Sequence, residues 1–179
     1  GFDLGHPETG ATQPMSLIAL VTGLQRAEVS AYVRQPGDAW AGPKDRLRQA
    51  MERGGHSPSY AKPSLFPVRD DLFLLMANHE YGVRGTAVED LTAATLRARR
   101  ELHQLVDGLR RLGAPWSRLR LVATGAQIGV REGRRLHGRY TVTVDDLVAG
   151  RRHDDAVCRV TFGIDVHSTR ADAGKGIEP

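Results

Sequence analysis

The chain has 179 residues, of which 40% are hydrophobic and 26% charged, and this is the size and composition of one ordinary globular domain. Its net charge of +4 comes from 25 basic and 21 acidic residues. A basic balance alone is weak evidence for a nucleic-acid partner, and the interleaving of basic with acidic residues disfavours one. The apolar runs MSLIALV and LFLLMA have the length of strands and not of membrane spans.

Cysteine usage limits the redox chemistry of the chain. Cys158 is the only cysteine, which excludes an internal disulfide and an iron–sulfur cluster held by this chain alone. A reducing, cytoplasmic setting is therefore the expectation. Because Cys158 stands in an apolar-leaning run, we expect a small buried core residue and not a nucleophile.

The first third of the chain predicts a loop, a strand and a short helix. Residues 1–14 are rich in Gly, Pro and Thr and are typical of a loop. Met15–Leu24 is apolar with little alternation, which predicts a strand buried on both faces. Gln25–Gln35 is a candidate short helix, ended by turn residues at 35–38.

Two more elements follow before the middle of the chain. Pro43 suits the first turn of a helix running to Arg53, where two glycines supply the stop. Three prolines within residues 55–67 predict a loop or an edge strand. Leu72–Asn78 is a further strand candidate.

The strongest prediction is a long helix from Ala87 to Leu112. Thr86 and Glu89 match a capping box at its start, and Gly113 ends it. Apolar residues recur at three- and four-residue spacing along one face, namely Leu91, Ala94, Ala98, Leu102, Leu105, Leu109 and Leu112.

The last third predicts three extended segments and one short helix. Leu119–Val130, Arg139–Val144 and Val157–Val166 are the extended segments. Thr143 with Asp146 can cap the helix, which Gly150 closes. The elements together predict an α/β fold of α+β character, with a mixed sheet of about four to six strands and one long helix.

One segment concentrates arginine. GVREGRRLHGRY places Arg131, Arg134, Arg135 and Arg139 within nine residues, directly after a predicted strand. Guanidinium groups pair with two oxygens of a carboxylate or phosphate at once. On composition alone, the simpler interpretation is a solvated arginine face with Glu132 as an internal partner.

Other polar groups carry weaker signals. The acidic pairs at 145–146 and 154–155 have no metal-ligand spacing, and dipole or local ion-pair effects account for them. None of the seven histidines is spaced like a zinc ligand set. Asp165 and His167 lie two residues apart on a predicted strand, so the carboxylate could orient the imidazole.

The segment from Gly129 to His167 resembles a signature of the FAD-dependent oxidoreductases. Members typically carry Gly-Ile/Val-Arg-Glu-Ser/Thr-Arg-Arg, then Gly and Tyr, then Asp-Asp-Ala, and finally Asp-Ile/Val-His. The matching positions here keep that order: Gly129, Val130, Arg131, Glu132, Arg134, Arg135, Gly138, Tyr140, Thr143, Asp146, Gly150, Asp154, Asp155, Ala156, Asp165 and His167. TQPMSL and EDLTAATLRARRELHQLVDGLR resemble the family's entering strand and long helix, so the resemblance covers nearly the whole chain.

The chain also departs from the family pattern. Gly133 stands where Ser or Thr is usual, and His137 stands where an aliphatic residue is common. Residues 36–70 do not match well. The family's GxGxxG segment and its later Gly-Arg segment are missing, and so are the P-loop, HExxH, CxxC and GxSxG motifs. Since FAD's pyrophosphate needs a glycine turn at a helix N-terminus, we expect this chain alone not to bind FAD tightly.

The resemblance implies the substrate-side domain of a two-domain flavoprotein that transfers a hydride between an organic substrate and flavin. Residues 1–14 would lead in from the FAD domain, 15–167 would form the substrate-side domain, and 168–179 would lead back. The implied site comprises Arg131, Arg134, Arg135, Tyr140 and His167. The implied partners are a small-molecule substrate and the rest of the FAD domain. The alternatives are a non-catalytic binding module of the same fold and a basic nucleic-acid-binding domain.

Overall fold

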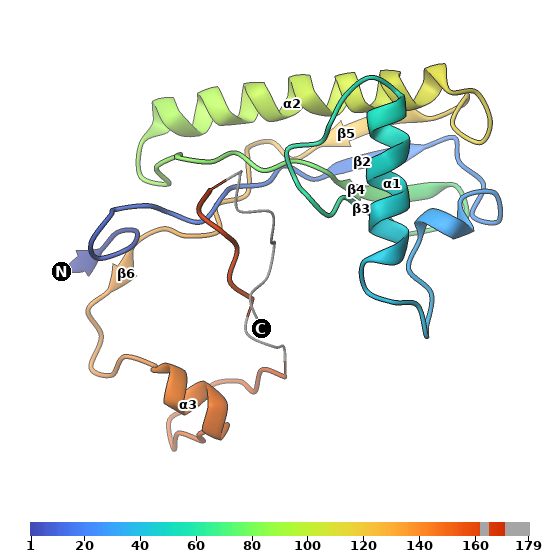
Figure 1. Cartoon of the computed structure of the whole chain (residues 1–179). Helices are drawn as coiled ribbons and strands as arrows, with labels where there is room; N and C mark the ends of the chain where they lie inside the picture. The colour runs from blue at the N-terminus through green and yellow to red at the C-terminus, as the bar shows by residue number, and fades with distance from the viewer. Residues whose placement is uncertain (162–164, 171–179) are drawn as a thin grey trace.

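The computed structural model describes residues 1–161 and 165–170, and its main body is a sheet covered by helices on one face (Figure 1). The elements in chain order are β1 (Phe2–Asp3), β2 (Ala19–Thr22), the 3-10 helix η1 (Ser30–Tyr32), α1 (Gly42–Arg53), β3 (Ser64–Pro67), β4 (Leu72–Met76), α2 (Val88–Arg111), β5 (Arg120–Thr124), β6 (Arg135–Leu136) and α3 (Val144–Ala149).

The strands divide between two sheets. The larger sheet has the order β3-β4-β2-β5, and every neighbouring pair in it is antiparallel. The smaller sheet pairs β1 with β6. The predicted α/β class and the single long helix are confirmed.

The chain before strand β2 extends the larger sheet beyond the β2 ladder. Met15 pairs with Glu80 and Ser16 pairs with Gly129 as isolated bridges. The side chain of Asn78 accepts from the Leu17 backbone N–H at 2.9 Å and donates to its carbonyl at 3.2 Å. This end of the sheet therefore brings residues near 15, 79 and 130 side by side, although they are far apart in sequence.

The core lies between the sheet and helices α1 and α2. The predicted stripe of α2 is buried from Ala94 to Leu109, while Leu112 is exposed at its end. The two helices approach closely where Gly54 meets Gly108. A Cβ on Gly108 would lie 2.8 Å from the Gly54 carbonyl oxygen, which explains a glycine that costs a helix about 1 kcal/mol relative to alanine.

The opposite face of the larger sheet is open within the described residues. Ile18, Phe66, Leu74 and Val122 are between 36% and 52% exposed. The prediction that Met15–Leu24 is buried on both faces is therefore wrong for this chain, because the helices cover one side only. Residues alternate along β2, with Ala19 and Val21 buried and their neighbours half-exposed.

The predicted caps are confirmed for helices α1 and α3, and the capping box predicted for α2 is not. Helix α1 has the predicted proline in its first turn and Gly54 as its C-cap. Helix α3 has the predicted capping box of Thr143 and Asp146, and Gly150 closes it in the left-handed conformation at φ 58°. The box predicted for α2 is wrong, because Ala87 is the N-cap and makes no side-chain bond.

Several predicted segments lack the expected structure. Residues 157–161 and 165–166 form no strand, and Cys158 is exposed instead of buried, because this stretch has no paired sheet edge within the described chain. Residues 139–144 are not paired either, since the ladder forms at Arg135–Leu136. Between Gln25 and Gln35 only turns and η1 are present. Among the described residues, no helix has both the length and the apolar character of a membrane span.

Candidate functional site

Four aromatic and imidazole side chains gather at the extended end of the sheet. The segment 165–170 lies beside this end (Figure 1). The rings of Tyr60 and His79 lie 4.2 Å apart between centroids, and those of His79 and His167 lie 5.1 Å apart at 73°. Tyr81 packs edge-on against His79 at 5.8 Å. Tyr60, His79 and His167 are buried. We call these four residues the polar cluster.

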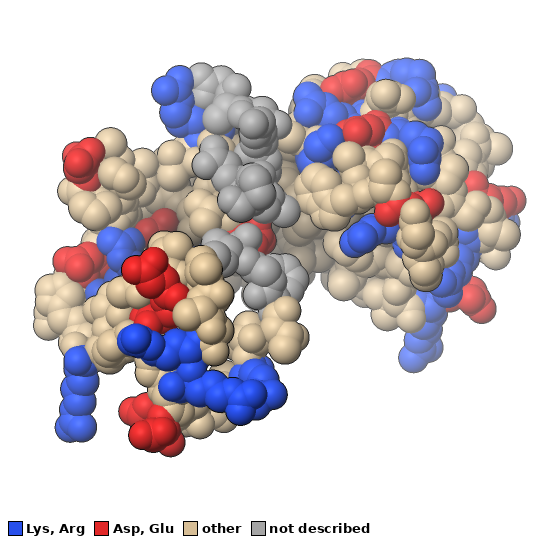
Figure 2. All heavy atoms as spheres, turned by 60° about the horizontal axis from the view of Figure 1, so that its bottom comes forward, with Lys and Arg blue, Asp and Glu red and all other residues tan. Residues whose placement is uncertain are grey.

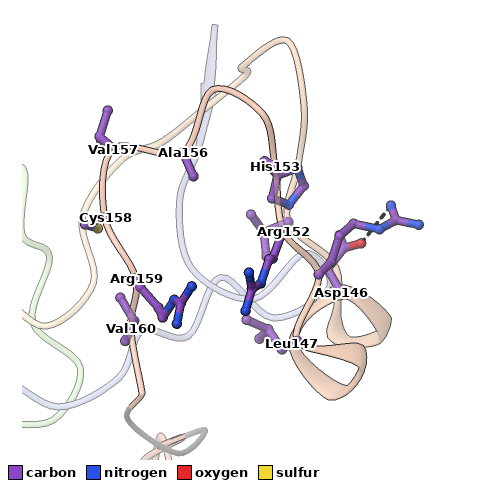
Figure 3. Close-up of a pocket in the computed structure, with 12 residues that line it drawn as sticks. Asp146, Leu147, Arg152, His153, Ala156, Val157, Cys158, Arg159 and Val160 are labelled. Carbon is purple, nitrogen blue, oxygen red and sulfur yellow. Dashed lines mark ion pairs between the residues drawn. The ribbon is translucent and has the colours of Figure 1, made fainter.

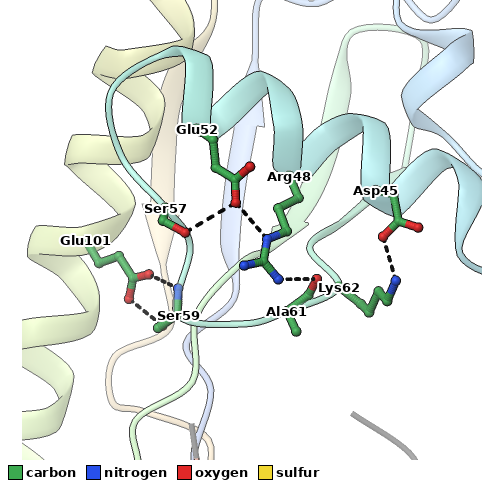
Figure 4. A network of polar contacts seen from close by, with 8 residues as sticks. All are labelled: Asp45, Arg48, Glu52, Ser57, Ser59, Ala61, Lys62 and Glu101. Atoms are coloured by element: carbon green, nitrogen blue, oxygen red, sulfur yellow. Dashed lines mark hydrogen bonds and ion pairs between the residues drawn. The ribbon is translucent and has the colours of Figure 1, made fainter. Parts of the chain in front are cut away.

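The loop that carries Tyr60 is fixed to helix α1 by one ion pair and by hydrogen bonds (Figure 4). Arg48 pairs with Glu52 at 2.8 Å and donates to the Ala61 carbonyl at 3.4 Å. Lys62 pairs with Asp45 at 2.5 Å. Both loop contacts lie directly after Tyr60, and before it the Ser57 hydroxyl donates to Glu52 at 3.4 Å. Helix α1 therefore holds the chain on both sides of Tyr60.

Helix α2 supports the same loop through one carboxylate. Glu101 accepts from the backbone N–H and the hydroxyl of Ser59 at 2.6 and 2.8 Å (Figure 4). The Ser59 hydroxyl oxygen in turn accepts from the backbone N–H of His79 at 2.9 Å. Both helices therefore contribute to the placement of the polar cluster.

Two buried imidazole nitrogens in the cluster have no hydrogen-bond partner within the described residues, namely His79 Nε2 and His167 Nδ1. The other nitrogens have neighbours: His79 Nδ1 lies 3.3 Å from the Tyr81 hydroxyl, and His167 Nε2 lies 3.3 Å from Asp165 Oδ1. A buried polar atom without a partner costs about 1–3 kcal/mol. A hydrogen bond to a polar group of a ligand would remove this cost.

Burial keeps both imidazoles neutral. It lowers the pKa of His79 to about 3, with smaller contributions from His167 and Arg131. Burial also lowers the pKa of His167, Arg131 adds to this effect, and Asp165 opposes it. At neutral pH each ring therefore has one N–H donor and one acceptor nitrogen, which suits it to form a hydrogen bond with a neutral polar group.

Arg131 adjoins the cluster through the extended segment at Gln13 and Pro14. Its Nε donates to the Pro14 carbonyl at 3.2 Å, and the backbone N–H of His167 donates to the Gln13 side chain at 3.0 Å. Glu132 also accepts from the Gln13 backbone N–H at 3.0 Å. Two adjacent residues therefore bring Arg131 and His167 together from positions far apart in the sequence.

The other predicted site residues lie elsewhere. Arg135 donates to the Gly5 carbonyl and pairs with Glu132, each at 2.6 Å, and Arg134 lies over the Phe2 ring at 5.2 Å. Both arginines hold the N-terminal segment. Tyr140 belongs to the region around α3, where its hydroxyl donates to Asp146 at 2.6 Å. Sequence reasoning missed Tyr60, His79 and Tyr81, which no motif or spacing marks.

The sequence comparisons identify the family. The family model described as FAD dependent oxidoreductase matches residues 1–178. The chain belongs to this family. No curated protein and no solved structure matches the chain.

The described residues of this FAD-dependent oxidoreductase do not fit the diphosphate of FAD. That group is held at a helix N-terminus in a parallel strand–turn–helix unit, whereas every strand pair here is antiparallel. Each α-helix also has an acid in its first turn, which repels phosphate: Asp45 in α1, Glu89 and Asp90 in α2, and Asp145 and Asp146 in α3.

The distribution of charged side chains and of metal-ligating residue types describes the rest of the surface. On the face shown in Figure 2, basic side chains lie among acidic ones. Within the described part of the chain, no group of three or more His, Cys, Asp or Glu residues is placed to hold a metal ion.

Proposed function

We propose that this chain is the substrate-side part of an FAD-dependent oxidoreductase that transfers a hydride between an organic substrate and flavin. The family match and the polar cluster beside Arg131 support the proposal. The FAD diphosphate would be held by residues outside the described chain, and flavin would supply the redox chemistry when bound. We expect the enzyme to act in the cytoplasm.

The observation that carries the proposal is the pair of imidazole nitrogens that lack partners among the described residues, beside the Arg131 guanidinium. Beyond its bond to Pro14, Arg131 has no side-chain partner within the described residues, and it is exposed. It would bind a negative group of the substrate. His79 and His167, both neutral at neutral pH, would each form a hydrogen bond with a polar group of the substrate.

A non-catalytic binding module is the second candidate, and the misfit to the FAD diphosphate favours it. The two functions differ in flavin content. We expect the whole protein to be purified with FAD and its flavin absorbance to bleach anaerobically with an organic substrate. A protein with no flavin that still binds a small molecule would support the binding module and contradict the oxidoreductase.

A further inference from the structure

A second site lies around α3, away from the polar cluster. The chain from Val142 to Val160 surrounds a hollow of about 800 Å³, open on one side, which we call the α3 pocket (Figure 3). Its walls combine apolar side chains, among them Leu147, Ala156 and Val160, with basic ones. Pockets of this size and mixed lining are typical of small-molecule sites.

Two arginines of this pocket have no counter-ion. Arg152 and Arg159 make no ion pair and no side-chain hydrogen bond within the described residues, and Figure 3 shows their side chains extending toward one another across the pocket. Two guanidinium groups that face each other repel. An anion between them removes this repulsion and satisfies the donor forks of both.

The acid in the pocket wall cannot neutralise these arginines. Asp146 already accepts from the Tyr140 hydroxyl at 2.6 Å and from Thr143 N–H and hydroxyl at 2.9 Å each. It also pairs with Arg151 at 2.9 Å (Figure 3). Its side chain is only 3% exposed, and both of its oxygens already have partners.

We propose that the α3 pocket binds a small molecule with a doubly charged oxyanion and an apolar part, through Arg152 and Arg159. The oxyanion is a phosphate group or a pair of carboxylates, which guanidinium forks recognise alike. The apolar walls at Leu147 and Val160 receive the rest of the molecule. This site is independent of the polar cluster and does not depend on flavin.

The test is calorimetric titration of the whole protein with pyrophosphate in one arm and succinate in the other. We expect saturable binding in at least one arm. Tighter binding of pyrophosphate identifies a phosphorylated ligand, and tighter binding of succinate identifies a dicarboxylate.

Variants link the binding to the two arginines. R152Q and R159Q should each weaken the binding by about tenfold, since each removes a charge-assisted contact. R100Q, which changes an exposed arginine of α2, is the matched control and should bind like the wild type. If either glutamine variant perturbs α3, R152K and R159K keep the charge and should lose part of the affinity. Absence of saturable binding in both arms, or glutamine variants that bind like the wild type, overturns the proposal.

Discussion

Two buried side chains of this protein differ in how fully their hydrogen bonds are satisfied. Asp146 is the clearest case of sharing, because three donors and Arg151 converge on one carboxylate. The Tyr140 hydroxyl contributes most to lowering the pKa of Asp146 to about 2, ahead of the Thr143 backbone. His79 is the opposite case, since it is buried with one nitrogen unpaired. Hydrogen bonds therefore lower the pKa of Asp146, whereas burial lowers the pKa of His79.

Replacing Tyr140 by Phe should raise the pKa of Asp146 toward its ordinary value, because the donor that lowers it most is lost. The measurement is an NMR titration of the Asp146 carboxyl carbon. Tyr32→Phe is the matched control, since its hydroxyl makes no hydrogen bond within the described residues while its ring packs on Trp116 at 4.8 Å. An Asp146 pKa that does not move in Tyr140→Phe would show that the hydroxyl bond is not formed.

Acid should destabilise the fold through His79. Its folded pKa of about 3 lies below its ordinary value of 6.5, so between these values the unfolded chain binds more protons. Stability is then fully present above about pH 6.5 and falls as the pH drops toward 3, by up to about 1.4 kcal/mol per pH unit. Chemical denaturation across this range should show a shallower pH slope for His79→Gln. Equal slopes in the wild type and the variant would contradict the burial of a neutral ring.

At the residue scale, the sequence predicts only part of the site. Arg131 and His167 stand in the segment that resembles the family, and the structure brings them together through Gln13 and Pro14. Tyr60 and His79 could not be predicted, because their meeting depends on contacts between a loop, a strand end and two helices. No local spacing encodes such contacts.

The helices α1 and α2 define the architecture at the scale of elements. Their apolar faces build the core, and their carboxylates and arginines fix the Tyr60 loop. The crossing of the two helices depends on the glycine pair Gly54 and Gly108, whose backbones touch. A side chain at either position has to displace the neighbouring backbone.

Gly108→Ala should destabilise the protein by roughly 1–3 kcal/mol, although alanine favours a helix by about 1 kcal/mol. The reason is the contact of its Cβ at 2.8 Å with the Gly54 carbonyl oxygen. Urea denaturation measures the effect. Gln104→Ala, at an exposed position of the same helix, should stay within about 0.5 kcal/mol of the wild type. A stabilised Gly108→Ala variant would mean that the helices do not cross at this point.

The sequence predicted helices well where residue periodicity and capping residues determine them. Helix α2 follows a strong 3.6-residue period, and Thr143, Asp146 and Gly150 form the expected caps of α3. The strand prediction failed where a strand forms only by pairing with a distant sheet edge. The apolar stretch 157–166 has strand composition, yet its described residues find no sheet edge, and Cys158 is exposed with it.

The whole molecule is a helix-covered sheet with one open apolar face and a separate region around α3 (Figure 1). Chain segments distant in sequence meet at one end of the sheet, where Arg131 adjoins the polar cluster. The residues needed for an FAD diphosphate are not among those described, while α1 and α2 hold the loop that carries Tyr60 of the polar cluster. In the proposed function, residues outside the described chain hold FAD, and Arg131, His79 and His167 bind the substrate.

The most direct test of this account is the rate of anaerobic flavin reduction by substrate in the whole enzyme, measured by stopped flow for Arg131→Ala. We predict a fall of about a hundredfold or more, with a free energy of unfolding lowered by about 1 kcal/mol or less. Arg100→Ala, at an exposed position of α2, should leave the rate unchanged. An Arg131→Ala enzyme that reduces its flavin at the wild-type rate would contradict the assignment of the substrate-side site.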